Sequence, residues 1–142
     1  MNFLLDTNVL SELVKREPNN NVVKWMHQTP QGQLHVSVLS LGEIYKGIEH
    51  LSQSRARKAQ LVTWVEEVLL NWFENRILPV EFSIAKRWGQ LQKQCPRTFP
   101  AVNLLLAATA LQHGFSVVTR HVQDFHAIPG LTIVNPWSEP LE

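Results

Sequence analysis

The chain has 142 residues, of which 44% are hydrophobic and 18% are charged. This length provides enough apolar sequence for one core and too little for two full domains, so we expect a single domain over residues 1–142. No apolar run reaches the roughly 18 residues of a membrane span, and the first residues lack the basic and apolar regions of a secretion signal, so we expect an unprocessed protein. Cys95 is the only cysteine, which excludes an internal disulfide and a thiolate zinc site and favours a reducing, cytoplasmic location.

The charges are unevenly distributed, although the net charge is only +1. Residues 51–100 carry eight Lys or Arg against four acids, whereas both flanking segments carry more acids than bases. A basic surface beside a carboxylate site produces this pattern, and so do ordinary solvated helix faces. Composition alone leaves both interpretations open.

The first half of the chain is predicted to alternate short strands with helices. The apolar run Asn2–Leu5 ends in Asp6–Asn8, three residues that cap helices well, so a strand should turn into a helix there. The next expected elements are a helix that stops before Pro18, a short helix at 22–27, a strand at 34–38 and a helix opened by Ser40.

The second half continues the alternation. Arg55–Glu74 is the longest predicted helix and carries a broad apolar stripe. The remaining expected elements are a strand at 77–80, a helix at 84–94, a loop at 96–100, a buried helix at 104–113 capped by Asn103 and ended by Gly114, and strands at 116–119 and 131–134. Strands that alternate with helices imply crossover connections and a mostly parallel α/β sheet.

Three acidic residues occupy places where such a sheet carries its site, beyond the carboxyl ends of the strands. Asp6 ends the first predicted strand, and Asp124 follows a later strand after Thr119 and Arg120. Glu43 lies near the start of the helix after the second strand. Each acid alone has a structural explanation, because carboxylates cap helices and turns and favour the positive end of a helix dipole.

Four short motifs occur in order along nearly the whole chain: Phe3–Asn8, Ser40–Ile44, Leu104–Ala110 and Val118–Arg120. In their order, spacing and expected positions they resemble the motifs of the PIN-domain ribonucleases, specifically the VapC toxins of bacterial toxin–antitoxin pairs. The resemblance implies a PIN-like three-layer α/β/α domain with a central, mostly parallel sheet flanked by helices.

The resemblance also implies a hydrolytic endoribonuclease that uses Mg²⁺, with Mn²⁺ as the alternative ion. Clustered oxygen ligands suit such a hard ion, which lowers the pKa of a bound water and neutralises charge on the phosphodiester. The family pattern assigns roles to eight residues. The catalytic set is Asp6, Glu43, Asn103 and Asp124, with Asp6 and Asn103 as metal ligands, and the supporting groups are Thr7, Asn8, Thr119 and His121.

Two positions depart from the family pattern. Asn103 stands where the family usually has an aspartate, and His121 stands where relatives commonly carry Asn or Asp. An amide oxygen can still contact a metal, but it brings no negative charge and cannot act as a base. We therefore expect an impaired or inactivated variant. Three explanations for Asn103 stay open: deliberate inactivation of a toxic nuclease, natural loss of the carboxylate, and plain helix capping.

Basic residues are the candidates for binding RNA through its phosphates, which gives affinity that is largely independent of sequence and falls with salt. The candidates are Arg55, Arg57, Lys58, Arg87, Lys93, Arg97 and Arg120. Five tryptophans could stack on bases, but helical spacing favours a place in the core. They are Trp25, Trp64, Trp72, Trp88 and Trp137.

The resemblance further implies partners: an RNA substrate, with transfer RNA as a candidate, a VapB-like antitoxin, a homodimer and a toxin–antitoxin hetero-oligomer, and no membrane. The apolar helix 61–73 is a candidate groove for the antitoxin, and ordinary core packing explains its apolar residues equally well. Two other functions remain. One is a catalytically dead PIN module that binds RNA or antitoxin without cleavage. The other is a phosphatase with Asp6 as nucleophile, which the sequence disfavours because Asn8 occupies the place of its usual second acid.

Overall fold

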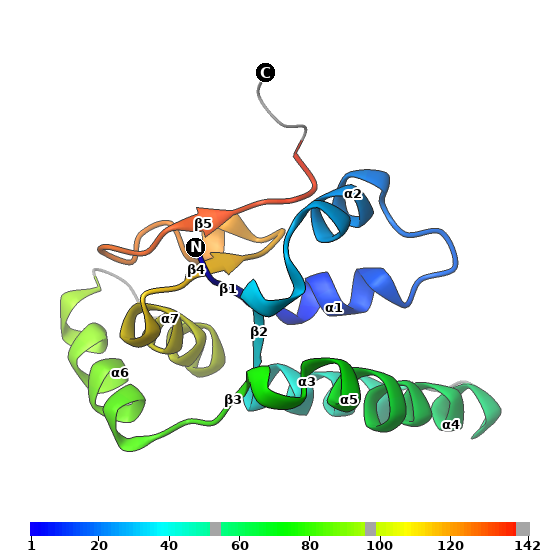
Figure 1. Cartoon of the computed structure of the whole chain (residues 1–142). Coiled ribbons are helices and arrows are strands. Elements are labelled where there is room, and N and C mark those ends of the chain that lie inside the picture. Colours follow the sequence, from blue (N-terminus) through cyan, green and yellow to red (C-terminus); the bar gives the residue numbers. More distant parts are fainter. Residues whose placement is uncertain (52–54, 96–98, 139–142) are drawn as a thin grey trace.

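A computed structural model describes residues 1–51, 55–95 and 99–138, and its centre is a parallel β-sheet (Figure 1). The strands have the order β3-β2-β1-β4-β5, and every pairing between neighbours is parallel. They are β1 (Phe3–Leu5), β2 (Leu34–Ser37), β3 (Ile77–Leu78), β4 (Ser116–Val118) and β5 (Ile133–Val134). The parallel α/β sheet predicted from the alternation of elements is therefore confirmed.

Helices cover both faces of this sheet (Figure 1). They are α1 (Thr7–Leu13), α2 (Asn20–Gln28), α3 (Val38–Glu49), α4 (Arg55–Thr63), α5 (Leu70–Phe73), α6 (Phe82–Gln94) and α7 (Ala101–His113). A π-helical stretch, Trp64–Leu69, joins α4 to α5, so the predicted long helix exists with one wider turn inside it. The three-layer α/β/α arrangement is the one expected.

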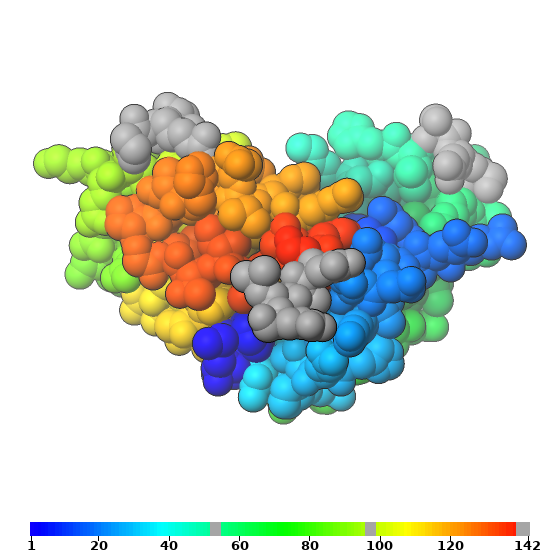
Figure 2. All heavy atoms as spheres, turned by 90° about the horizontal axis from the view of Figure 1, so that it is seen from above, coloured from blue at the N-terminus to red at the C-terminus, as the bar shows by residue number. Residues whose placement is uncertain are grey.

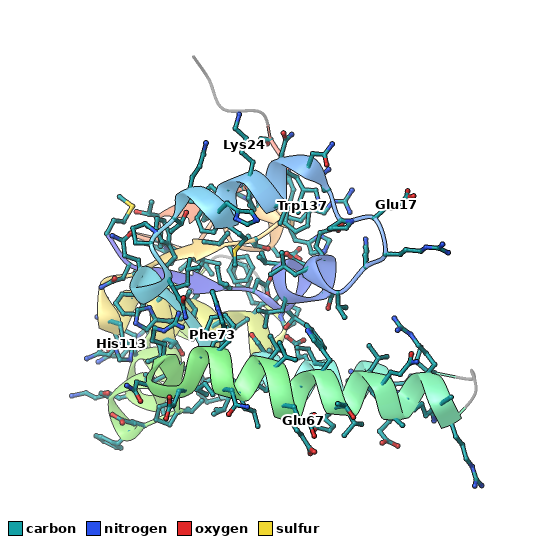
Figure 3. All side chains as sticks on the ribbon, turned by 45° about the vertical axis from the view of Figure 1, so that its right-hand side comes forward. Glu17, Lys24, Glu67, Phe73, His113 and Trp137 are labelled. Carbon is teal, nitrogen blue, oxygen red and sulfur yellow. The ribbon has the colours of Figure 1, made fainter. Side chains whose placement is uncertain are left out.

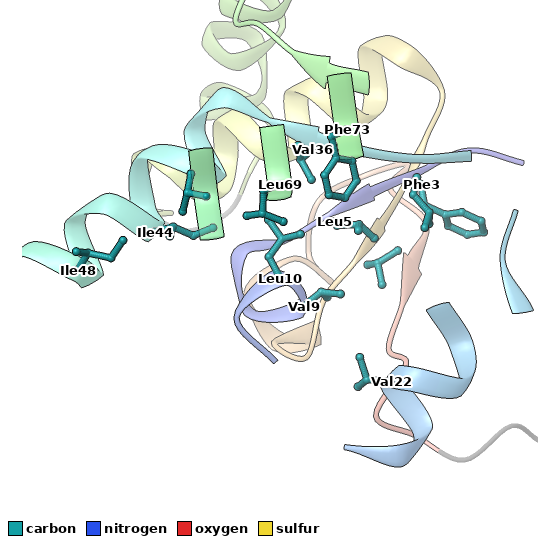
Figure 4. Close-up of a cluster of buried hydrophobic side chains, with 13 residues drawn as sticks. Phe3, Leu5, Val9, Leu10, Val22, Val36, Ile44, Ile48, Leu69 and Phe73 are labelled. Carbon is teal, nitrogen blue, oxygen red and sulfur yellow. The ribbon is translucent and has the colours of Figure 1, made fainter. Parts of the chain in front are cut away.

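Alternation along β1 divides the core into two clusters, because successive side chains of a strand point to opposite faces. Phe3 and Leu5 pack with α1, α2, α3 and the long helix, and Figure 4 shows Leu10, Ile44 and Phe73 converging on this face. Leu4 packs with α6 and α7 on the other face. Figure 3 shows Phe73 pointing inward from the long helix and Glu67 pointing away from the core.

Four helices begin earlier than the sequence predicted, the first of them α2, which starts at Asn20 rather than at residue 22. The third helix starts at Val38 because Ser37, not Ser40, caps it: the Oγ of Ser37 accepts a hydrogen bond from Leu39 N at 3.1 Å. Ser40 is fully buried in the first turn, and its Oγ has no partner in the described part of the chain. The sixth helix begins at Phe82 rather than at residue 84.

The seventh helix begins at Ala101 and not after Asn103. Pro100 occupies the cap position, where its fixed φ suits the start of a helix, and no side chain caps the first turn. Asn103 is thus inside the helix, so the capping explanation for this residue is wrong. Gly114 ends the helix with φ +73°, as predicted, and directs the chain into β4. The predicted loop at 96–100 lies partly outside the described residues.

Four of the five tryptophans pack in the core, as expected. Trp25, Trp64 and Trp137 contact the first cluster and Trp88 the second. Trp72 is the exception, because its ring is 37% exposed beneath the Arg76 guanidinium, 4.8 Å from the ring centroid. In the described residues, no helix has both the length and the apolar character that a membrane crossing requires.

Glu12 is a buried carboxylate that ties the end of α1 to the start of α2. Its side chain is only 5% exposed. It accepts hydrogen bonds from Lys15 Nζ at 2.9 Å and from Asn19 N at 3.0 Å. The hydrogen bond from Lys15 is the largest influence and lowers the pKa of Glu12 below its usual value, although burial acts in the opposite direction.

We expect Glu12→Gln to destabilise the protein by about 1–2 kcal/mol at pH 7, because it weakens two charge-assisted hydrogen bonds. A carboxylate whose pKa is lowered by folding stabilises the native state above its unfolded pKa, about 4.3, and loses that contribution as pH falls through the folded pKa. The difference between variant and parent should therefore shrink below about pH 4. Urea unfolding at pH 7 and at low pH measures it, with the exposed Glu17→Gln as the control. An equal loss at both pH values would contradict the assignment.

Candidate functional site

Asp6 lies where β1 turns into α1, at the carboxyl edge of the sheet. Its backbone N donates to Val118 O at 2.9 Å, which holds it beside the end of β4. Its Oδ1 accepts from Thr7 N at 2.8 Å, so the side chain also caps α1. Asp6 is 7% exposed. The capping interpretation is thus confirmed, but it uses only one of the two carboxylate oxygens.

The second oxygen of Asp6 accepts two side-chain hydrogen bonds from different elements. Asn8 Nδ2 and Thr119 Oγ1 each donate to Oδ2 at 2.9 Å. Thr119 is fully buried, and Asn8 Nδ2 also lies 3.2 Å from its hydroxyl. A carboxylate offers about four lone-pair sites, and three are occupied here. Asp6 is therefore fixed in orientation and retains room for one further partner.

Glu43 is connected to Asp6 through Thr7. The Thr7 hydroxyl donates to Glu43 Oε1 at 2.8 Å, while the backbone N of the same threonine binds Asp6. Glu43 lies in the second turn of α3, which starts directly after β2, so parallel pairing brings it to the same edge of the sheet. No described residue donates a hydrogen bond to the other oxygen of Glu43 at the distances that define one. The structure thus brings together Asp6, Thr7 and Glu43.

The segment after β4 folds back over this site. Arg120 N donates to Asn8 Oδ1 at 3.1 Å, and His121 N donates to Thr119 Oγ1 at 3.0 Å. The guanidinium of Arg120 lies 5.5 Å from the centroid of the Trp137 ring. Figure 3 shows Trp137 beside α2. Arg120 is therefore an exposed cation at the border of the site, and His121 joins the site through its backbone.

Asn103 reaches the same edge of the sheet through the direction of its helix. Because α7 ends at Gly114 and leads into the start of β4, its first turn points toward the carboxyl end of that strand. Asn103 is partly buried there, and its side chain makes no hydrogen bond within the described ranges. The residue neither caps the helix nor satisfies a neighbour, which leaves its amide free for a ligand.

Asp124 does not join the other acids. It is exposed in a 3₁₀ turn (Val122–Asp124) that is anchored by Phe125, whose side chain is 1% exposed. Across residues 1–51, 55–95 and 99–138, no three His, Cys, Asp or Glu side chains lie close enough together to hold a metal ion. The expectation that Asp124 completes an acidic pocket with Asp6 and Glu43 is therefore not met in this structure.

The oxygen ligands that remain still fit a divalent ion. Mg²⁺ is commonly held by one or two carboxylates and keeps several waters, and Asp6 and Glu43 supply two carboxylates joined by one threonine. The neutral amide of Asn103 lies at the same edge. The residues present thus fit a hard ion, with less negative charge than three acids would give.

The surface is indented at the edge of the sheet that carries these groups. Figure 2, a view from above, shows a notch in the outline between the teal surface of α3 and α4 and the light-orange surface that follows β4. The first surface includes the helix of Glu43 and the second the segment of Arg120. The notch therefore lies between the surface of the helix that carries Glu43 and the surface of the segment that carries Arg120.

The basic candidates are spread over separate parts of the molecule. Arg55, Arg57 and Lys58 belong to the first turn of α4, and Arg87 and Lys93 belong to α6. Arg120 is connected to the site by a hydrogen bond of its own backbone. Arg97 lies outside the described residues.

One exposed aromatic was missed by the sequence analysis. Phe82 is 82% exposed at the start of α6. Its position could have been found from periodicity, because Ile84, Trp88 and Leu91 define the buried stripe of that helix and Phe82 falls on the opposite side.

Comparison with known proteins places these features in one family. The family model described as PIN domain matches residues 3–130. The plasmid stability protein StbB of Pseudomonas syringae pv. tomato is 35% identical over 95% of this chain and 98% of its own. The VapC ribonuclease Y4jK of Sinorhizobium fredii is 31% identical over 95% and 97%.

The fold has solved counterparts as well. The structure of FitAB bound to an IR36 DNA fragment superimposes with a TM-score of 0.87 at 31% identity, covering 98% of both chains. Toxin FitB of Neisseria gonorrhoeae is 32% identical over 96% of this chain and 99% of its own. With the site motifs in order and nearly the full length matched, the chain belongs to the PIN-domain family.

Proposed function

We propose that this chain is the toxin of a toxin–antitoxin pair, a metal-dependent endoribonuclease whose activity is impaired because Asn103 replaces a carboxylate. The observation that carries the proposal is the hydrogen-bonded set formed by Asp6, Thr7 and Glu43 at the carboxyl edge of the sheet. The free amide of Asn103 at the same edge supports it. The names of the relatives, a VapC ribonuclease and a toxin, point in the same direction.

Each residue has a definite role in this proposal. Asp6 and Glu43 hold the ion directly or through water, and Asn103 contributes an oxygen without charge. Thr119, Asn8 and Thr7 keep the carboxylates in fixed orientations, as partners of ligands usually do. Mg²⁺, or Mn²⁺ in its place, supplies positive charge beside the phosphodiester and lowers the pKa of water.

In this proposal Asp124 and His121 contribute from outside the hydrogen-bonded set of Asp6, Thr7 and Glu43. Both side chains are exposed on the segment that follows β4. They can approach an RNA or a hydrated ion from the open side of the notch. Arg120, on the same segment, can contact a phosphate, and its ring partner Trp137 limits the positions of the guanidinium.

The partners follow from the relatives' complexes. The solved relatives include FitAB on DNA and VapBC complexes on DNA. We therefore infer a VapB-like antitoxin and a homodimer within a hetero-oligomer. The ribonuclease names of two relatives support an RNA substrate, for which transfer RNA is the candidate, and we propose a cytoplasmic location.

A second candidate function is a PIN module that binds RNA or antitoxin without cutting. It is favoured by the lack of any three-acid group in the described parts of the chain. The phosphatase alternative is weaker still, because Asn8 uses its amide to hold Asp6 and Arg120, and Glu43 would have no part in that chemistry.

We expect Asn103→Asp to create metal-dependent cleavage of RNA, because it restores a negative ligand without changing side-chain size. Both forms are incubated with total cellular RNA and Mg²⁺, and the products are separated on a gel. An excess of chelator should abolish cleavage by the Asp form, and the parent should cut weakly or not at all. Calorimetry should show tighter Mg²⁺ binding by the Asp form.

Asp6→Asn in the Asn103→Asp protein serves as the matched control, since it removes a carboxylate from the other side of the site. If neither the parent nor the Asn103→Asp form cuts RNA while both fold and bind Mg²⁺, the nuclease proposal fails. The binding module then becomes the better description.

Thr119→Val, made in the Asn103→Asp protein, should weaken Mg²⁺ binding by about 10–100-fold, because it removes a hydroxyl that orients Asp6. Calorimetric titration with Mg²⁺ measures the change. The matched control is Thr109→Val in α7, another fully buried threonine, whose hydroxyl donates to the backbone of its own helix at Leu105 O. Equal Mg²⁺ affinity in the two variants would show that Thr119 only fills space.

A further inference from the structure

A polar cleft lies between the first half of α6 and the end of α7, which pack side by side (Figure 1). It has a volume of about 340 Å³ and is lined by Phe82, Ser83, Lys86, Arg87, Gln90 and Gln112. Phe82 is 82% exposed, an unusual state for a phenylalanine in water. The exposed ring gains free energy whenever a flat partner covers it.

The other lining groups are suited to an anion. Lys86 and Arg87 carry the positive charge, and neither is paired with a carboxylate among the residues that the structure describes. Phe82 and Lys86 are four residues apart, so the ring and the cation occupy one side of the helix. Ser83 and two glutamine side chains add neutral donors. The nearby acid, Glu81, precedes the helix and does not line the cleft.

We propose that this cleft binds a stretch of single-stranded RNA, with a base stacked on Phe82 and phosphates held by Lys86 and Arg87. Proteins that bind single-stranded nucleic acids combine aromatic rings with cationic side chains. The rings stack on the bases, and the cations contact the negatively charged phosphates of the backbone. A lipid or protein surface would instead favour several apolar residues, and Phe82 is the only large apolar side chain in this lining.

The cleft is separate from the carboxylate site. Gln112 at the cleft and Asn103 near the site are nine residues apart on α7, about 14 Å along the helix axis. The RNA held here is therefore a segment that flanks the cut, which makes the cleft a substrate-retaining exosite. Only this last role rests on the proposed ribonuclease function, since binding itself needs no metal and no cleavage.

The test measures binding in the presence of chelator, so that cleavage plays no part. Fluorescence anisotropy follows a labelled oligouridylate of about 12 nucleotides. Phe82→Ala should weaken binding about five- to a hundredfold, and Phe82→Tyr should keep it. The control for an exposed apolar side chain is Val80→Ala, which lies outside the lining and should leave affinity unchanged.

The charges are tested in the same assay. Arg87→Gln should weaken binding more than Lys93→Gln, which removes the same charge from the same helix outside the cleft. An RNA duplex of equal length should not respond to Phe82→Ala, because its bases cannot reach the ring. Circular dichroism confirms that each variant is folded.

The outcomes separate the proposals. Equal affinity of Phe82→Ala and parent for the oligouridylate overturns the exosite. A change of oligomeric state in Phe82→Ala at unchanged RNA affinity also overturns the exosite. That result would assign the Phe82 ring to a contact between protein chains. A loss of binding in Phe82→Ala supports the exosite even if the Asn103→Asp protein cuts nothing, because that second result bears only on the nuclease.

Discussion

The chain of hydrogen bonds from Thr119 through Asp6 and Thr7 to Glu43 is the interaction on which the site depends. It joins the end of β4, the end of β1 and the second turn of α3 at one edge of the sheet. Parallel pairing alone would bring these segments together. The hydrogen bonds convert that proximity into a fixed orientation of two carboxylates, which an ion needs if it is to find its ligands already in place.

The same constraint underlies the role proposed for the neutral residue Asn103. Two carboxylates linked through a threonine are tolerable neighbours without a cation, because neutral donors bind both oxygens of Asp6 and one oxygen of Glu43. A third carboxylate at position 103 would add repulsion that a bound ion must offset. The amide removes that repulsion together with the charge that attracts metal. Under the proposed function, the protein without an ion therefore carries less repulsion at this edge of the sheet and also attracts an ion less strongly.

Much of this could be predicted from the sequence, and the failures have physical reasons. The turn from β1 into α1 follows from an apolar run that meets three capping residues, and Gly114 ends α7 as a glycine with positive φ should. Helix starts were harder, because Ser37 and Ser40 are equally good caps and only the extent of β2 decides between them. A turn at Asp124 with Phe125 in the core follows from the local sequence, but the position of that turn relative to Asp6 and Glu43 depends on tertiary packing, which no local pattern contains.

The fold distributes the positively charged residues of the sequence over separate parts of the surface. The basic middle of the sequence reads as a single feature, yet folding sends Arg55 to α4, Arg87 to α6 and leaves Arg120 beside the carboxylates. Under the proposed function, the directions of the helices decide which of these arginines can contact an RNA that is bound at the carboxylate site. Because α6 and α7 are antiparallel neighbours, the start of one meets the end of the other, away from Asp6. Under the proposed function, a long flexible RNA contacts both the carboxylate site and the cleft of α6, whereas a short RNA reaches only one of them.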